Sequence, residues 1–85
     1  MFSVYVLCSK TTGRLYTGST SNLSIRIEQH NSDATRSTKH RGPWELIHHK
    51  EYASRAQAVV RERELKTGKG RDEVKRIVTA GKRSG

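Results

Sequence analysis

The sequence is poor in the residues that cross-link or stiffen a small protein. Its 85 residues include one cysteine, Cys8, and one proline, Pro43. A single cysteine excludes an intramolecular disulfide and a cysteine-rich metal cluster. Because unpaired cysteine is typical of reducing compartments, we expect a cytoplasmic chain in which Cys8 is a buried free thiol.

Large apolar side chains are also scarce. Leucine, isoleucine, valine and phenylalanine together make up 16 of the 85 residues. No apolar run approaches the roughly 18 residues of a membrane span, and the apolar start of the chain lacks the basic region and cleavage site of a signal peptide. We therefore expect one domain of low stability over residues 1–80 and a disordered basic tail over residues 81–85.

Acidic residues are outnumbered by basic ones. The chain has 8 Asp and Glu against 17 Lys and Arg, which gives a formal net charge of +9. The excess is uneven, because residues 36–50 carry +3 and residues 61–85 carry +5. Cationic stretches of this kind are typical of proteins that bind a polyanion, most simply nucleic acid. A solubilising surface or a ribosome-type basic protein would carry the same charge.

Periodicity and turn residues predict an α+β domain with a small sheet, in the order β-β-α-loop-β-α-α. Thr11-Thr12-Gly13 supplies the turn of a hairpin, and Thr20 or Ser21 can cap the first helix. Ser54 opens the second helix with a capping box, and Gly68 can end it. The predicted strands are 2–7, 14–17 and 44–52, the helices are about 22–30, between Ser54 and Gly68, and around 74–78, and the loop is 31–43.

Glu62 is the unusual carboxylate of this chain. Of its four helix neighbours three or four residues away, three are apolar and only Lys66 is polar, so Glu62 is expected on the buried side of its helix. A buried carboxylate needs a cation. Helix position alone favours an ion pair with Lys66 or Arg26 over metal binding.

Other single residues have ordinary explanations. Tyr5 and Tyr16 fit a strand surface or core, Arg26 fits a solvated helix face, and His30 fits the C-terminal end of a helix dipole. The remaining histidines lack the spacing of a zinc site. The glycines lack the spacing of a phosphate-binding loop, so we expect no nucleotide cofactor.

In combination, these residues resemble the motif series of the GIY-YIG nuclease family. The motifs are, in order, Ser3-Val4-Tyr5, Tyr16-Thr17-Gly18, Arg26, His30 and Glu62, with a step of eleven residues from Tyr5 to Tyr16. Over residues 2–78 the chain looks like the small stand-alone bacterial endonucleases of that family. It departs from the pattern at Ser3, where the first motif has Gly, and at Thr17, where the second has Ile. It also has no Asn after residue 31, whereas some larger members use one near the site.

The resemblance implies a three-stranded sheet flanked by helices, and hydrolysis of phosphodiester bonds with one divalent ion, Mg²⁺ or Mn²⁺. By the same resemblance, Glu62 binds the metal, Tyr5 deprotonates the attacking water, and Arg26 stabilises charge on the phosphorus centre. Tyr16 and His30 orient these groups. The expected substrate is DNA, with RNA as the alternative, recognised by structure or weakly by sequence, or with the help of a targeting protein partner.

A phenol needs help to act as a base near neutral pH. Its ordinary pKa is about 10, so roughly three units must come from nearby positive charge. The available sources are Arg26 and a cation bound by Glu62.

Basic residues near the motifs are expected to bind substrate phosphates. They are Lys39, Arg41, Lys66, Lys69 and Arg71. Lys66 follows Glu62 by one helical turn, where it can hold a phosphate.

Three functions therefore remain open. The resemblance favours a metal-dependent DNA endonuclease. The alternatives are a non-catalytic nucleic-acid-binding module and a basic structural or ribosome-associated protein in which Glu62 is only a salt-bridge partner.

Overall fold

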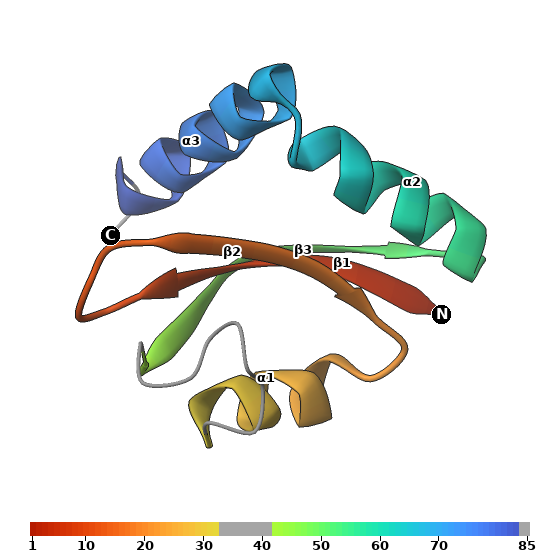
Figure 1. Ribbon diagram of the computed structural model, residues 1–85, viewed down its shortest axis with the longest axis horizontal. Coiled ribbons are helices and arrows are strands. Elements are labelled where there is room, and N and C mark those ends of the chain that lie inside the picture. Colours follow the sequence, from red (N-terminus) through yellow and green to blue (C-terminus); the bar gives the residue numbers. More distant parts are fainter. Residues whose placement is uncertain (33–41, 84–85) are drawn as a thin grey trace.

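The central strand of the sheet is β1 (Phe2–Ser9) in the computed structural model, which describes residues 1–32 and 42–83. It pairs antiparallel with β2 (Leu15–Thr20) on one side and with β3 (Trp44–Tyr52) on the other, so the strand order is β2-β1-β3 (Figure 1). The predicted α+β class with a small three-stranded sheet is confirmed, as is the order of its helices and strands. Most of the predicted loop, residues 33–41, lies outside the described residues.

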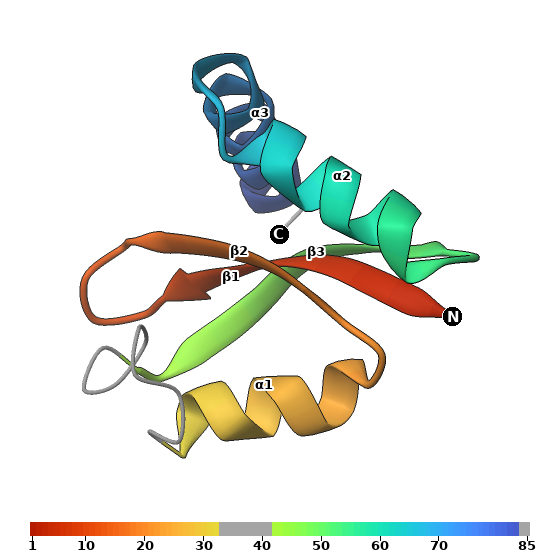
Figure 2. The same ribbon diagram turned by 45° about the vertical axis from the view of Figure 1, so that its right-hand side comes forward.

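Helices cover both faces of this sheet. One face packs against α1 (Leu23–Asn31), and the other packs against α2 (Arg55–Leu65) and α3 (Gly68–Arg83) (Figure 2). The outer edge of β2 lies between these two layers. Side chains from the α1 layer and from the α2–α3 layer can therefore meet around that edge.

β1 supplies both hydrophobic cores. Successive side chains of a strand point to opposite faces. Val4 and Val6 face α2 and α3, where they pack with Ala58, Leu65 and Val74. Tyr5 and Leu7 face α1 and pack with Trp44. Tyr5 points away from the face of Val4 and Val6, as the alternation predicts, yet it is only 1% exposed because α1 covers the second face as well.

The β1–β2 hairpin closes at the predicted turn. Gly13 has a φ of 75°, a left-handed conformation that favours glycine. The hydroxyl of Ser9 accepts hydrogen bonds from the N–H groups of Thr11 and Thr12 at 3.3 and 3.1 Å. The N–H of Lys10 donates to the carbonyl of Pro43 at 2.9 Å, which fastens the turn to the residues that precede β3.

The helix caps agree with the prediction at α2 and differ at α1. The hydroxyl of Ser54 accepts the N–H of Gln57 at 3.2 Å, as the capping box predicts. At α1 the cap is Asn22, whose Oδ1 accepts the N–H of Ile25 at 3.2 Å. Thr20, one of the two predicted caps, instead accepts the N–H of Asn22 at 3.1 Å and so supports the true cap. Ser, Thr, Asn and Asp side chains all suit the N-cap position, so residue type alone does not decide between Asn22 and its neighbour Ser21.

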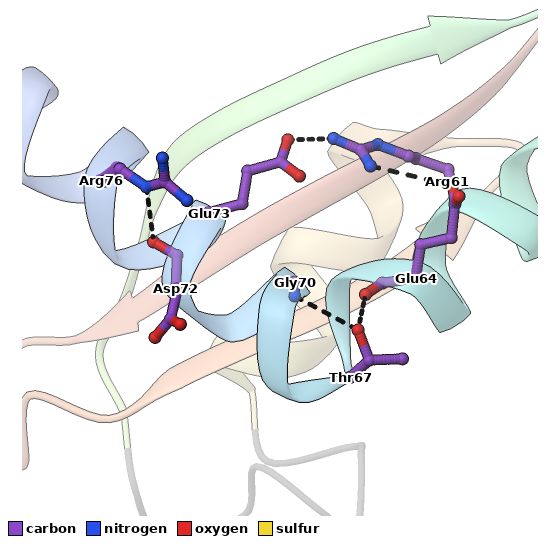
Figure 3. Close-up of polar contacts among 7 residues, drawn as sticks. All are labelled: Arg61, Glu64, Thr67, Gly70, Asp72, Glu73 and Arg76. Atoms are coloured by element: carbon purple, nitrogen blue, oxygen red, sulfur yellow. Dashed lines mark hydrogen bonds and ion pairs between the residues drawn. The ribbon is translucent and has the colours of Figure 1, made fainter.

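The predicted end of α2 is wrong. Gly68 does not end this helix, because α2 ends at Leu65 and Gly68 is the first residue of α3. The Thr67 hydroxyl donates to the carbonyl of Glu64 at 2.7 Å and accepts the N–H of Gly70 at 3.2 Å, so one side chain joins the two helices (Figure 3). Gly68 thus begins a helix instead of ending one, and it is Gly70, two residues later, that lies close to the end of α2.

Two smaller expectations also change. Cys8 is a free thiol but is only partly buried. α3 is helical to Arg83, so it extends into the segment 81–85 that was expected to be a disordered tail. Among the residues that the structure describes, no helix has the length and apolar character needed to cross a membrane.

Gly70 should be far more sensitive to substitution than Gly68. A Cβ at Gly70 would lie 1.9 Å from the carbonyl oxygen of Glu64, whereas a Cβ at Gly68 would meet nothing within 4 Å. We expect Gly70→Ala to lower the free energy of unfolding by about 2–3 kcal/mol, because backbone must move. Gly68→Ala, the matched control, should leave it unchanged or raise it by up to about 1 kcal/mol. Urea denaturation measures both, and equal effects would contradict the close contact of α2 with α3.

Candidate active site

The Tyr5 hydroxyl is the centre of a polar cluster between β1 and α1. Its oxygen lies 2.9 Å from Nε2 of His30, within hydrogen-bond distance. Arg26 donates to the same oxygen from Nε at 3.4 Å. Arg26 and His30 are one helical turn apart, so a single face of α1 presents both groups to the phenol.

Gly18 makes room for the ring of Tyr5. The two residues are direct partners in the β1–β2 ladder. A Cβ at Gly18 would lie 2.6 Å from the Tyr5 hydroxyl oxygen and 2.8 Å from the ring carbon that bears it. A glycine is therefore needed at the third position of Tyr16-Thr17-Gly18, because the phenol of Tyr5 occupies the space that a side chain at residue 18 would fill.

Tyr16 forms an aromatic wall beside this cluster. Its ring centroid lies 4.8 Å from that of His30 and 6.3 Å from that of Tyr5. On another side it meets the edge of Trp44 at 6.4 Å. These contacts place the ring of His30 between the rings of Tyr5 and Tyr16.

Burial determines the protonation of Tyr5 and His30. It raises the pKa of Tyr5 above its ordinary value, and the hydrogen bond from Arg26 lowers that pKa by less. Burial also lowers the pKa of His30 to about 4, with the positive charge of Arg26 acting in the same direction. At neutral pH the cluster therefore holds a neutral phenol, a neutral imidazole and a guanidinium. The lowered phenol pKa that a base requires does not come from Arg26 by itself.

Glu62 contacts β2 from the opposite face of the sheet, the face covered by α2 and α3. One carboxylate oxygen accepts a hydrogen bond from the Ser19 hydroxyl at 2.6 Å, and the other lies 2.7 Å from Nζ of Lys66. Of the two cations predicted as its partner, Lys66 is the one paired with it. Partial burial raises the pKa of Glu62, but the bonds from Lys66 and Ser19 outweigh it and leave the pKa below its usual value.

Lys66 links the two halves of the site around the edge of β2. Its ammonium group contacts Glu62 and lies 6.0 Å from the centroid of the Tyr16 ring. A cleft of about 380 Å³ opens near the other end of β2, with Ser19, Arg26 and Arg55 in its lining. The structure thus brings together Tyr5, Tyr16, Arg26 and His30 on one face, and Glu62 and Lys66 on the other.

The structure describes two of the four other residues that were predicted to contact phosphates. Lys69 and Arg71 lie exposed in the first turn of α3. Lys39 and Arg41 lie outside the described residues.

Three polar residues of the site were missed by sequence reasoning. Ser19 holds Glu62, Gln29 accepts a hydrogen bond from Arg26 at 3.0 Å, and Asn31 is bonded to both backbone groups of Trp44 at 2.6 and 3.2 Å. Gln29 could have been found from its i,i+3 spacing to Arg26. Ser19 and Asn31 act across elements, and no local pattern marks them.

The residues at Glu62 fit one hard cation. The described residues contain no cluster of three or more His, Cys, Asp and Glu side chains that could hold a metal ion. Mg²⁺ is commonly bound through one or two carboxylates, with waters and substrate phosphates as its other ligands. A single carboxylate beside a phosphate-binding surface meets that requirement, provided that Lys66 gives up its carboxylate oxygen.

Comparison with known proteins identifies the family. The model of the GIY-YIG catalytic domain matches residues 1–76. The chain belongs to the GIY-YIG nuclease family. A UPF0213 protein of Natronomonas pharaonis is 39% identical over 66 residues, 75% of each chain, and one of Staphylococcus aureus is 37% identical over 67 residues, 78% of this chain and 79% of the relative.

A solved structure has the same fold. The solution NMR structure of a UPF0213 protein from Bacillus halodurans matches with a TM-score of 0.52 at 31% identity, covering 87% of this chain and 82% of the other. The predicted membership and α+β class are confirmed. The match to a catalytic domain suggests an endonuclease that acts on a nucleic acid.

Acidification should destabilise the protein through His30. Below pH 6.5 the unfolded state takes up a proton on this imidazole, whereas the folded state takes it up only near pH 4. Because the unfolded state then binds more protons, stability falls as the pH falls through this window, by about 3 kcal/mol in all.

Chemical denaturation at pH 7 and pH 4 tests this effect. His30→Gln should lose less stability on acidification than the wild type, while His49→Gln, at an exposed position, should behave like the wild type. NMR titration of the His30 ring checks the same point without a variant. A ring that titrates near pH 6.5 in the folded protein would contradict its burial beside Arg26.

Proposed function

We propose that this protein is a divalent-metal-dependent endonuclease that hydrolyses phosphodiester bonds of DNA, with selectivity for structure or weak selectivity for sequence. The main support is the arrangement at the edge of β2, where Lys66 joins the carboxylate of Glu62 to the aromatic cluster around the Tyr5 hydroxyl. A base, a cation and a metal-binding carboxylate at one edge are the groups that such hydrolysis needs.

Tyr5 is the proposed base. To act as a base Tyr5 must first lose its own proton, and the Arg26 guanidinium stabilises the resulting phenolate through the hydrogen bond already present at 3.4 Å. The phenolate then takes a proton from the attacking water and becomes a neutral phenol again. His30 is neutral at neutral pH, so its Nε2 can carry a proton and donate it in a hydrogen bond to the phenolate. The two groups on α1 thus hold the phenol in place and favour its ionised form.

Arg26 has a second proposed role toward the substrate. Its side chain lines the 380 Å³ cleft together with Arg55, so a phosphate in that cleft would meet two guanidinium groups. Arginine pairs with phosphate through two parallel hydrogen bonds. We assign Arg26 to the charge that develops on the phosphate oxygens, as the resemblance implies.

Glu62 is the proposed ligand of one Mg²⁺ or Mn²⁺ ion. When bound there, the ion supplies positive charge that opposes the charge on the phosphate oxygens and favours ionisation of nearby groups. Ser19 orients the carboxylate through its hydrogen bond to one oxygen. Lys66, released from the other oxygen, becomes available to a phosphate, and Lys69 and Arg71 extend the same basic surface.

The following parts of the proposal are supported only by the family resemblance and by the positive charge of the chain. Lys39 and Arg41 are predicted to contact phosphates, and RNA is the alternative substrate. A targeting protein partner and a cytoplasmic location also stay predictions.

Glu62→Ala should reduce Mg²⁺-dependent nicking of plasmid DNA by at least about a hundredfold. DNA affinity should stay the same or rise slightly, because a negative charge near the phosphate is removed. The side chain of Lys66 is 51% exposed, so loss of the ion pair should cost less than about 1 kcal/mol of stability. Loss of cleavage would then not result from unfolding.

Glu64→Ala is the matched control. Glu64 lies on the same helix, is exposed and pairs with Arg61 at 3.7 Å, away from Ser19 and Lys66. It should cleave like the wild type. Equal cleavage by Glu62→Ala and the wild type would leave Glu62 as a salt-bridge partner and favour the non-catalytic binding module.

Tyr5→Phe should remove most of the activity while the ring keeps its packing. We expect cleavage to fall by at least about a hundredfold at every pH, because the base is lost. In the wild type the rate should rise between about pH 6 and pH 9, since the raised pKa of Tyr5 leaves little phenolate at neutrality. Tyr52→Phe, on β3, is the control and should change neither rate nor profile. A rate independent of pH would contradict the assignment of Tyr5 as the base.

A further inference from the structure

A cavity of about 550 Å³ lies between the outer edge of β2 and the corner where α2 meets α3. Leu65 and Val74, which are 4% and 3% exposed, form its apolar floor. Leu15 and Tyr16 form the wall on the strand. Leu15 is 38% exposed, which leaves a large apolar side chain uncovered on an edge strand.

The rim of this cavity is cationic. Lys66, Arg71 and Lys75 are exposed residues in its lining, and none of the described lining residues is acidic. A phosphate requires the cations but has no use for an apolar floor. A nucleotide requires both, because its base buries an aromatic surface while its phosphate stays at the rim.

The cavity is continuous with the candidate active site. Tyr16 and Lys66 belong to both, and Nζ of Lys66 lies 2.7 Å from the carboxylate of Glu62. A nucleotide in the cavity and a phosphate held at Glu62 could therefore be close neighbours in one DNA strand. A volume of 550 Å³ is in the range of pockets for small organic ligands.

We propose that this cavity takes one unpaired nucleotide of the substrate strand, next to the phosphate that is cleaved. This inference rests on the proposed function and specifies its substrate class. The base lies against Leu15 and Tyr16 over the apolar floor, and the phosphate binds Arg71 and Lys75. A paired base must leave its stack to enter, which is least costly at a mismatch, a flap or a single strand. The preferred substrate is therefore DNA with an unpaired nucleotide beside the cleavage position.

Binding without cleavage provides the test. Two ten-base-pair duplexes that differ only in a central T·T mismatch or T·A pair carry equal numbers of phosphates, so their non-specific electrostatic binding is the same. In EDTA, fluorescence anisotropy should show about tenfold tighter binding of the mismatched duplex by the wild type. Leu15→Ser should bring this ratio close to one and leave affinity for the paired duplex unchanged.

Two arginines of α3 provide a matched pair of variants. Arg71→Gln should weaken binding of the mismatched duplex more than that of the paired one. Arg76→Gln removes the same charge from an exposed position outside the cavity, so it should leave the ratio unchanged. A wild-type ratio of one, or a ratio that survives both Leu15→Ser and Arg71→Gln, would overturn the proposal.

Photo-crosslinking locates the nucleotide directly. With 4-thiothymidine at the mismatch, irradiation should join the DNA covalently to the wild-type protein. The crosslinked tryptic peptide should be the one that spans residues 15–26, which begins with Leu15 and Tyr16. Attachment of the DNA through another peptide would overturn the proposal. The two failures are distinguishable: selective binding without any cleavage removes the nuclease, whereas cleavage with equal binding of both duplexes removes the nucleotide pocket.

Discussion

The buried hydroxyl of Tyr5 is the interaction on which both the fold and the candidate site depend. Tyr5 is a core residue of the central strand, packed with Leu7 and Trp44. A phenol in that position leaves a polar oxygen inside the protein, and such a group is costly unless it is hydrogen-bonded. His30 and Arg26 meet this requirement, and doing so fixes α1 against the sheet. In the described residues, no buried side-chain nitrogen or oxygen is left without a hydrogen bond.

This dual use suits a chain with few large apolar side chains. Tyr5 and His30 serve both packing and chemistry, because both are buried in the protein and both belong to the candidate site. Gly18 also serves both packing and the site, because the absence of a side chain leaves room for the Tyr5 ring. Variants at these positions will change stability and activity together. A loss of activity at Tyr5 or Gly18 must therefore be compared with a measurement of stability, whereas at Glu62 and Lys66 the side chains are partly exposed and replacement costs little stability.

Local chemistry made much of this structure predictable from its sequence. The three strands, the Gly13 turn and the Ser54 cap follow from residue type and spacing, although β2 continues to Thr20 and does not end at residue 17 as predicted. The motif series supplied the candidate site residues, which are Tyr5, Tyr16, Arg26, His30 and Glu62. What sequence could not supply depends on contacts between elements. Gly68 and Gly70 read equally well as helix stops, and only the approach of α3 to Leu65 shows that Gly70 is a packing residue. Ser19 has no local signature, since its role comes from a strand register that turns it toward α2.

If Glu62 binds the metal as proposed, Lys66 explains how one carboxylate can have both a structural and a metal-binding role. In the absence of substrate, its ammonium keeps Glu62 ionised and paired, so the negative charge is never left without a partner at the edge of β2. On the proposed mechanism, a DNA phosphate and Glu62 compete for the same ammonium group. A phosphate that draws Lys66 away frees a carboxylate oxygen for the divalent ion, and an ion at Glu62 frees Lys66 for the phosphate. By linkage, each must then strengthen the binding of the other to the same extent. Metal and DNA would therefore assemble together on this site, and the weak metal affinity expected of a single carboxylate is consistent with a nuclease whose second set of metal ligands is its substrate.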